Sequence, residues 1–401
     1  MISSGEADPG VHPADVLDRL DDEARDRLDP AGMLRAVASG GAQIREAAAL
    51  ISPESLATVA EDGRPRAVLV TGLGDSGQMG ELAVALTGAR CPVPVVSHHG
   101  ERLPGWVGSV DLVIAVSCHG DDRETLSATD EALRRGARTV TVGAAGSPLA
   151  GRSVRGRAVH LPVASHGRAA RANLWAMVVP VLLVLDAVGL LDVPPPALTA
   201  TADRLDEIAA RCGPAIELVD NPAKGLALQL THTLPILWGA SDLAAFAAAR
   251  GAALLAENAK LPALHGAIPE VLRSQVAVFA GTFGALAGAD RAGRGADAPL
   301  DRIFWDPVED GPVHTVARLV VLRDTDELPE VALRAKAALQ TADRFGVTGS
   351  ELRADGEHVL QRLASLVGVL DFVSVYVALL QGIDPSPVEP ILSAEKAAIS
   401  R

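Results

Sequence analysis

The stretch RAVLVTGLGDSGQMGELAVALTGA, residues 66–89, decides the fold of this chain. A short β-branched run enters a glycine-rich turn, and a helical pattern follows the turn. A strand, a glycine turn and a helix in this order are typical of folds that bind nucleotides or phosphates. We interpret the turn at 71–77 as a phosphate-binding turn, in which backbone N–H groups and the Ser76 hydroxyl contact the anion. We take its third glycine to be misplaced for the G-x-G-x-x-G fingerprint of dinucleotide-binding folds. The alternative to a phosphate-binding turn is a simple tight turn.

The same alternation of strand and helix patterns recurs on both sides of a proline-rich boundary near 190–200. Such alternation predicts an α/β fold with parallel, doubly wound sheets and sites at the carboxyl ends of the strands. We therefore predict an N-terminal helical segment (1–50), a first subdomain (51–195) and a second subdomain (196–401), each subdomain a three-layer αβα structure. The Gly/Ala-rich segment 284–302 is predicted to be a mobile loop.

Composition and net charge indicate the type of core and limit the kinds of partner that the protein can bind. Of the 401 residues, 48% are hydrophobic and only 3% aromatic, which predicts a core of alanine, valine and leucine. The net charge of -14 argues against a nucleic-acid or acidic-membrane partner, because the dominant phosphate attraction is missing. A small anionic substrate is still compatible, since a few arginines and a helix N-terminus can make a pocket locally positive.

The sequence also suggests where the protein works. Its three cysteines are widely spaced without a CxxC pair, which favours a reduced cytoplasmic setting. The N-terminus is acidic and has no apolar segment typical of a secretion signal. The longest apolar run, 174–191, carries Pro180 and Asp186 and lacks basic flanks, so we predict a buried helix and no membrane partner.

The segment VSCHGDDRETL, residues 116–126, combines a histidine, a cysteine and carboxylates. Adjacent residues in a strand point to opposite faces, so few of these side chains can reach one ion, and we predict no metal. The histidine pair in SHHGE, 97–101, is likewise interpreted as a solvated loop pair. We expect Asp121 or Asp122 to cap the following helix, with Glu124 in its first turn.

A second chemical cluster lies in AENAKLPALHGAIPE, residues 256–270. It places Glu257, Asn258, Lys260 and His265 close together after an alanine-rich helix. These residue types can serve acid–base chemistry at the edge of an active site, or they can be the ordinary surface turn of a helix end.

Taken together, these segments resemble the sugar isomerase (SIS) domain family, and more closely the bifunctional phosphoglucose/phosphomannose isomerases of archaea and bacteria. The similarity runs from about Asp29 to the C-terminus, and several spaced motifs occur in the family's order. The segments that carry it are LPGWVGSVDLVIAVSCHGDDRETL (103–126), NPAKGLALQL (221–230), AARGAALLAENAKLPALHGAIPE (248–270) and LDFVSVYVALLQGIDPSPVEPI (370–391).

The resemblance implies two tandem SIS subdomains and a homodimer with the active site at the subunit interface. It implies reversible isomerisation of glucose 6-phosphate or mannose 6-phosphate to fructose 6-phosphate through a cis-enediol. A small-molecule sugar phosphate is the implied partner, without cofactor or metal. Such chemistry needs a ring-opening acid or base, a carboxylate that moves a proton between C1 and C2, and positive charge near the enediolate.

The family's roles pass to matching positions of this chain. Glu257 matches the catalytic glutamate, Arg168 the arginine near the enediolate, and Lys396 falls near the ring-opening lysine. Other interpretations stay open: Glu257 as a surface charge, Lys396 as a solvated tail residue, and Arg171 facing the site in place of Arg168. The residues predicted to bind substrate are Gly74, Ser76, Ser117, His119, Asp122 and Arg273.

Two departures from the family pattern bear on activity. The family's SYSGNT is SCHGDD here, so His119 and Asp122 stand where a serine and a threonine hold the phosphate, and Asp122 would repel it. Arg273 stands where the family has a catalytic histidine; His265, expected in the preceding loop, is a candidate replacement. Three hypotheses follow: a phosphosugar isomerase, a non-catalytic sugar-phosphate sensor or scaffold, and an isomerase for a different carbohydrate derivative.

Overall fold

The computed structural model describes residues 27–284 and 315–399, which divide into two compact units. The N-terminal unit comprises Gly32–Gly213 together with Gly356–Gly368. The C-terminal unit comprises the described residues from Pro214 to Asp355 and from Val369 onward, together with residues 27–31. Residues 1–26 of the predicted segment 1–50, and residues 285–302 of the predicted loop 284–302, lie outside the described residues.

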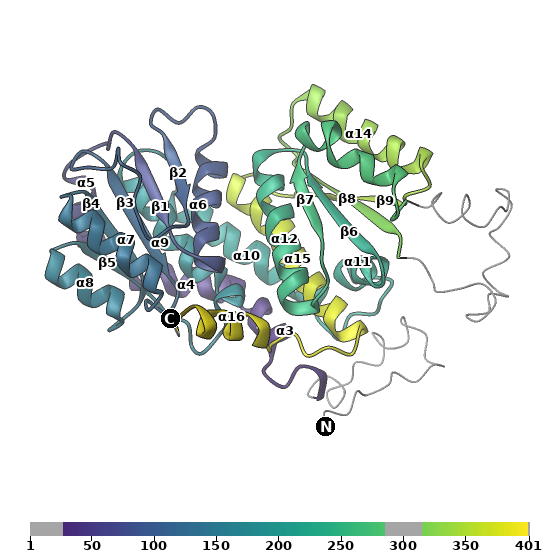
Figure 1. The fold of residues 1–401 in the computed structure, drawn as a ribbon, viewed down its shortest axis with the longest axis horizontal. Helices are drawn as coiled ribbons and strands as arrows, with labels where there is room; N and C mark the ends of the chain where they lie inside the picture. The colour runs from purple at the N-terminus through teal and green to yellow at the C-terminus, as the bar shows by residue number, and fades with distance from the viewer. Residues whose placement is uncertain (1–26, 285–314, 400–401) are drawn as a thin grey trace, which may run out of the picture. The chain divides into compact units, whose positions relative to one another are not determined.

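The N-terminal unit is built on a parallel sheet with the strand order β2-β1-β3-β4-β5 (Figure 1). The strands are β1 Val68–Thr71, β2 Val95–His98, β3 Leu112–Ser117, β4 Arg138–Ala144 and β5 Val159–Val163. The helices are α3 Met33–Ala38, α4 Gly40–Leu50, α5 Pro53–Ala60, α6 Gly74–Thr87, α7 Arg123–Arg134, α8 Pro148–Gly156, η1 Ala170–Ala172, α9 Leu174–Ala187 and α10 Pro195–Cys212. Because β3 is buried along its whole length, its sequence is a continuous apolar run, as is typical of a central parallel strand.

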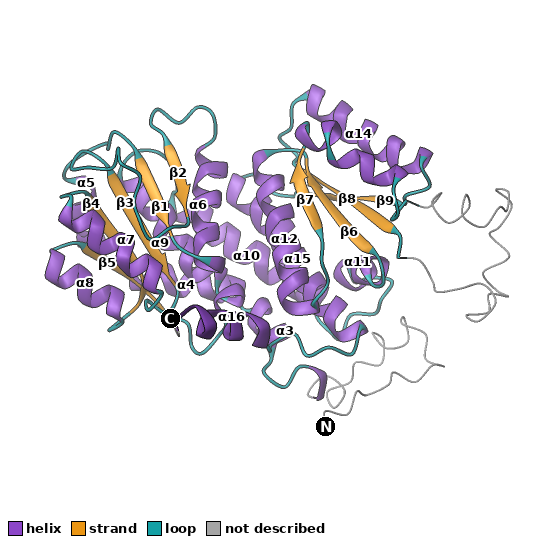
Figure 2. Cartoon of the chain, viewed as in Figure 1, coloured by secondary structure: helices purple, strands orange, loops and turns teal. Residues whose placement is uncertain are grey.

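The C-terminal unit is built on a second parallel sheet with the order β7-β6-β8-β9 (Figure 2). The strands are β6 Leu234–Gly239, β7 Leu264–Ala267, β8 Ala317–Arg323 and β9 Gly349–Arg353. The helices are α11 Pro222–Leu230, α12 Asp242–Ala259, η2 Glu270–Arg273, η3 Gln275–Ala280, α14 Pro329–Arg344, α15 Val359–Leu380 and α16 Glu389–Ile399. The two parallel sheets confirm the predicted α/β class with tandem SIS-type subdomains.

The small-residue composition appears directly in the packing of the second sheet. Ala335, Ala338 and Ala342 of α14 are fully buried, and their spacing places them on one face of the helix, toward the sheet. Trp238 and Phe279 supply aromatic area, with ring centroids 5.4 Å apart, and the Trp238 indole N–H donates to Gln275 Oε1 at 2.9 Å. The predicted aliphatic core is therefore confirmed here, with one aromatic pair at its centre.

Two helices are strongly apolar. The predicted buried helix is α9, whose residues are almost all buried. α15 is long and apolar enough to cross a membrane, with a mean hydropathy of 2.2, but 94% of its apolar window is buried inside the protein. Burial of this extent is typical of a core helix in a globular protein. α15 also begins in residues of the N-terminal unit and ends in residues of the C-terminal unit.

Candidate functional site

In the N-terminal unit, β1 and β3 lie side by side and end at the same edge of the sheet, where Thr71 pairs with Ala115. The chain continues from β1 into α6 and from β3 into α7, and the strand order changes direction at β1. This is a topological switch point, the position where ligands bind in open α/β sheets. The predicted residues that follow these two strands are Gly74, Ser76, Ser117, His119 and Asp122.

The two predicted phosphate serines both make hydrogen bonds in these turns. The buried Ser76 hydroxyl accepts the backbone N–H of Cys118 at 3.0 Å and donates to Met177 Sδ at 3.5 Å. The Ser117 hydroxyl, also buried, accepts the N–H of Gly120 at 2.9 Å. Ser76 therefore joins the β1–α6 turn to the β3–α7 turn, and Ser117 stabilises the β3–α7 turn itself. The contact of either hydroxyl with a phosphate stays a prediction.

The glycines of the β1–α6 turn have identifiable roles. Gly74 opens α6 with a φ of 51°, a left-handed conformation that side chains disfavour. At Gly77 an added Cβ would lie 2.7 Å from His99 Nδ1, so the helix packs too closely for any side chain. Gly72, Gly74 and Gly77 do have the G-x-G-x-x-G spacing, so the prediction that the third glycine is misplaced is wrong.

Arg168 is held near the same edge through Asn173. Its Nε donates to Asn173 Oδ1 at 2.9 Å, and Asn173 Nδ2 contacts Cys118 Sγ at 3.5 Å. Burial raises the pKa of the Cys118 thiol; the Asn173 hydrogen bond opposes the rise, and the charge of Asp75 adds to it. The thiol is thus a packing and hydrogen-bonding group and not a nucleophile.

Asp122 occupies the N-cap position of α7, but its side chain makes no capping hydrogen bond. Burial raises the pKa of the Asp122 carboxyl, a hydrogen bond with Ser117 opposes the rise, and the charges of Asp121 and Glu124 increase it. His119 is exposed and its charge favours the Asp122 carboxylate. In residues 27–284 and 315–399, no group of three or more His, Cys, Asp or Glu side chains is placed to hold a metal ion.

The raised pKa of the Asp122 carboxyl predicts how the stability of the protein depends on pH. A carboxyl whose folded pKa exceeds its unfolded value contributes stability below the unfolded pKa, and this contribution is lost as pH rises through the folded pKa. Asp122→Asn should therefore have a higher Tm than the wild type at pH 7, and the difference should disappear near pH 3. A change of about 1 kcal/mol in the free energy of unfolding corresponds to roughly 2–4 °C in Tm for a unit of about 150–250 residues. Asp121→Asn, at a more exposed neighbour, is the control; an equal gain at both pH values contradicts the assignment.

In the C-terminal unit, Glu257 lies near the end of α12 and is partly exposed. Because α12 leads from the carboxyl end of β6 back to the amino end of its neighbour β7, Glu257 lies at the amino edge of this sheet. The expectation that sites follow the carboxyl ends of strands therefore does not locate Glu257. Lys260 ends the helix in a left-handed conformation, with φ 57°, and its Nζ donates to the Glu257 carbonyl at 2.6 Å.

Buried polar contacts attach α12 to α15 on both sides of Glu257 in the sequence. Arg250 Nε and Nη2 donate to Asp371 Oδ1 at 3.1 and 2.9 Å, and both side chains are almost fully buried. Asn258 Nδ2 donates to Ser374 Oγ at 2.9 Å. These pairs join the segments 248–270 and 370–391, which carry the resemblance stated above, so α12 and α15 are held together at positions that flank Glu257 in the sequence.

The remaining predicted residues lie on separate elements of the C-terminal unit. Arg273 is exposed in η2, and Lys396 is exposed in α16. His265, expected in a loop, lies in strand β7 and is also exposed. The strand was missed because its four residues are flanked by prolines and alternate between half-buried and exposed positions.

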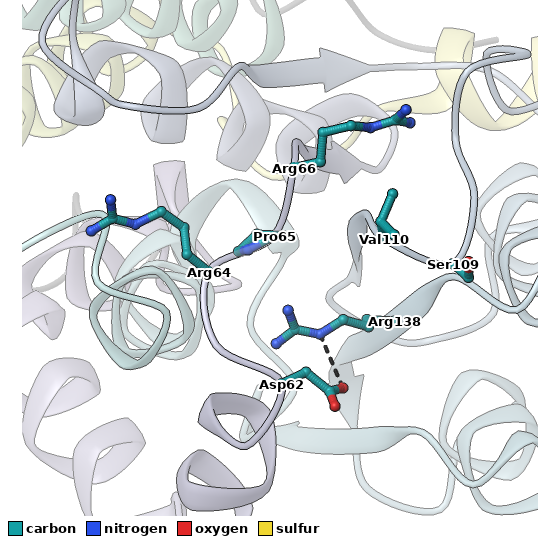
Figure 3. Close-up of a pocket in the computed structure, with 7 residues that line it drawn as sticks. All are labelled: Asp62, Arg64, Pro65, Arg66, Ser109, Val110 and Arg138. Atoms are coloured by element: carbon teal, nitrogen blue, oxygen red, sulfur yellow. Dashed lines mark ion pairs between the residues drawn. The ribbon is translucent and has the colours of Figure 1, made fainter.

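A cavity of about 550 Å³ lies at the amino edge of the first sheet (Figure 3). Its arginines have structural partners: Arg66 makes two hydrogen bonds to Asp111, and Arg138 lies 3.3 Å from Asp62. The Arg64 and Arg66 guanidinium groups extend in different directions. No predicted site residue lines this cavity, which is lined by Asp62, Arg64, Pro65, Arg66, Ser109, Val110 and Arg138.

Comparisons with known proteins agree with this architecture. Residues 219–396 match the bacterial phospho-glucose isomerase C-terminal SIS domain. The chain is 27% identical over 324 residues to a bifunctional phosphoglucose/phosphomannose isomerase of Caldicellulosiruptor bescii, covering 81% of this chain and 87% of the relative. It is 25% identical over 337 residues to the protein of the same name from Aquifex aeolicus, covering 83% and 91%.

The fold is also that of a glucose-6-phosphate isomerase like protein from Thermus thermophilus, with a TM-score of 0.53, 21% identity, and coverage of 93% of this chain and 98% of that one. Residues 219–396 thus match an SIS domain, and the chain is distantly homologous to the bifunctional phosphoglucose/phosphomannose isomerases.

Proposed function

We propose that the protein interconverts an aldose 6-phosphate, glucose 6-phosphate or mannose 6-phosphate, with fructose 6-phosphate. The observation that carries the proposal is the fixed position of Glu257 on α12. This carboxylate lies between Arg250 and Asn258 in the sequence, and the hydrogen bonds of both to α15 restrain the helix that presents it. The names of the Caldicellulosiruptor and Aquifex relatives support the same reaction.

In this proposal each catalytic residue has one step. The Glu257 carboxylate takes the C2 proton of the open-chain aldose and returns it to C1 of the cis-enediol, while the O2 hydroxyl proton passes to O1, and the product is the ketose. The Arg168 guanidinium stabilises the negative charge that develops on the enediolate oxygen. Lys396 transfers the proton that opens the sugar ring. These roles rest on the family resemblance, and the reaction as written needs no redox partner.

The phosphate would bind at the N-terminus of α6. The first turn of a helix presents free backbone N–H groups and a partial positive charge. Gly74 brings the backbone close to the ligand, and His119 adds a donor on the adjacent turn. Arg273 is a further residue that would bind the substrate. Two chains would form a homodimer with the site at the subunit interface, in the cytoplasm.

A second candidate function is favoured by the charge of the β3–α7 turn. Asp121, Asp122 and Glu124 lie together there; burial raises the pKa of the Asp122 carboxyl, and the charges of Asp121 and Glu124 add to the rise. Carboxylates accept hydrogen bonds from sugar hydroxyls but repel a phosphate dianion. This turn would therefore suit a different carbohydrate derivative. With Arg273 in place of a ring-opening histidine, a non-catalytic sugar-phosphate sensor is the third possibility.

A coupled assay of fructose 6-phosphate isomerisation, combined with a thermal-shift screen, separates these functions. The screen contains glucose 6-phosphate, mannose 6-phosphate, fructose 6-phosphate and the corresponding unphosphorylated sugars. Turnover and stabilisation by the phosphates support the isomerase. Stabilisation by phosphates without turnover supports the sensor, and stabilisation by unphosphorylated sugars alone supports the different substrate. Neither turnover nor any sugar-phosphate binding refutes the first proposal.

A further inference from the structure

His99 forms a polar cluster at the carboxyl edge of the first sheet that the proposed mechanism does not use. It follows β2 directly, and its Nδ1 lies 3.2 Å from the carbonyl oxygen of Gly72. Its Nε2 lies 2.6 Å from Glu81 Oε1 and 3.1 Å from Ser97 Oγ. The imidazole therefore connects the end of β2, the start of the β1–α6 turn and α6.

The turn is shaped around this ring. Gly77 lies in the first turns of α6, and an added Cβ there would lie 2.7 Å from His99 Nδ1 and 2.9 Å from its Cε1. At Gly80, one helical turn on, an added Cβ would lie 2.3 Å from Ser97 Oγ. The glycines thus let α6 approach β2 closely enough for the imidazole to reach the Gly72 carbonyl.

The imidazole faces a polar group on each side of the ring. A carbonyl oxygen only accepts, so the contact between Nδ1 and Gly72 is a donation from the ring. On the other side, Nε2 lies 2.6 Å from the Glu81 carboxyl and also contacts the Ser97 hydroxyl, which can donate or accept. The arrangement therefore places an imidazole, paired with the Glu81 side chain, behind the turn that leads into α6.

We propose that His99 is a positioning residue of the sugar-phosphate site, an inference that rests on the proposed function. Held by Glu81, the imidazole fixes the Gly72 carbonyl and with it the direction of the N–H groups at residues 74–76. Both side chains are 45% exposed, so the pair lies at the surface of the unit.

Two measurements on the full-length protein test the inference. The first is hydrogen exchange without ligand at the amides of Gly72 and Gly77, which bond to the His98 and Leu73 carbonyls. His99→Ala and Glu81→Gln should accelerate exchange there, whereas His99→Asn, whose amide can donate to the Gly72 carbonyl, should restore protection. His166→Ala is the matched control, because His166 makes an equally short, exposed contact with Glu46 elsewhere in the unit.

The second measurement is calorimetric titration with fructose 6-phosphate and with inorganic phosphate. His99→Ala should raise the Kd for both by about tenfold, as for loss of one charge-assisted interaction, and His99→Asn should recover part of the affinity. Unchanged exchange in His99→Ala overturns the positioning role. Accelerated exchange with unchanged affinities overturns the link to the anion. A wild type that binds neither anion refutes the sugar-phosphate site itself, while the exchange data still decide whether His99 holds the turn.

Discussion

Glu257→Gln is expected to lower kcat for fructose 6-phosphate isomerisation by about 10³-fold, with little change in KM. The amide has nearly the same shape as the carboxylate but cannot accept the C2 proton, and general base catalysis is typically worth 10²- to 10⁴-fold. Because Glu257 is partly exposed, and Arg250 and Asn258 keep their contacts with α15, the Tm should remain that of the wild type. The measurement is the coupled assay, with thermal unfolding recorded on the same samples.

The matched control for this variant is Glu330→Gln. Glu330 is an exposed carboxylate in the first turn of α14, within the same unit, and its loss should leave kcat unchanged. A Glu257→Gln protein that keeps more than about a tenth of the wild-type kcat would exclude this residue as the proton-transfer base. The search would then turn to the other carboxylates of the C-terminal unit.

Asp371→Ala is expected to lower the free energy of unfolding by about 3–5 kcal/mol. The substitution leaves the guanidinium of Arg250, whose side chain is only 1% exposed, without its carboxylate. Removing one partner of a buried ion pair has a cost of this size, because the remaining charge stays out of water. Thermal and urea unfolding, followed by circular dichroism, measure the loss.

A double variant separates charge from packing at this position. Arg250→Met with Asp371→Leu removes both charges and fills similar volume, so it should recover most of the stability that Asp371→Ala loses. Ser374→Ala should have a smaller effect, about 1 kcal/mol, since it removes one neutral hydrogen bond to Asn258. A Tm for Asp371→Ala within about 2 °C of the wild type would contradict the assigned role of the pair.

Local patterns were sufficient to predict most of the fold. The runs that became β1, β3, β6 and β8 are mostly β-branched or apolar, because central parallel strands are buried on both faces. β7 and β9 were not predicted, because in each strand half-buried residues alternate with exposed ones and a glycine is present. Such short edge strands are defined by pairing with a neighbour, and the neighbour is distant in the sequence.

The candidate site could be predicted only as residue types at strand ends. The sequence predicted a phosphate contact for the Ser76 hydroxyl, which stays a prediction, but not its hydrogen bonds with Cys118 and Met177, which are far along the chain. Likewise SHHGE suggested a solvated histidine pair, although His99 reaches back to Gly72 and Glu81. Hydrogen-bond partners depend on how the strands are ordered, and no short motif encodes that order.

The helix α15 has a consequence for the synthesis of the chain. The N-terminal unit includes residues 356–368, and an added Cβ at Gly368 would lie 3.2 Å from both Ile208 and Leu205 of α10. Because translation is vectorial, the ribosome releases residues 32–213 long before the segment that completes their core. We therefore expect α10 to expose apolar surface on the nascent chain until residue 368 has emerged, so this unit completes its folding late.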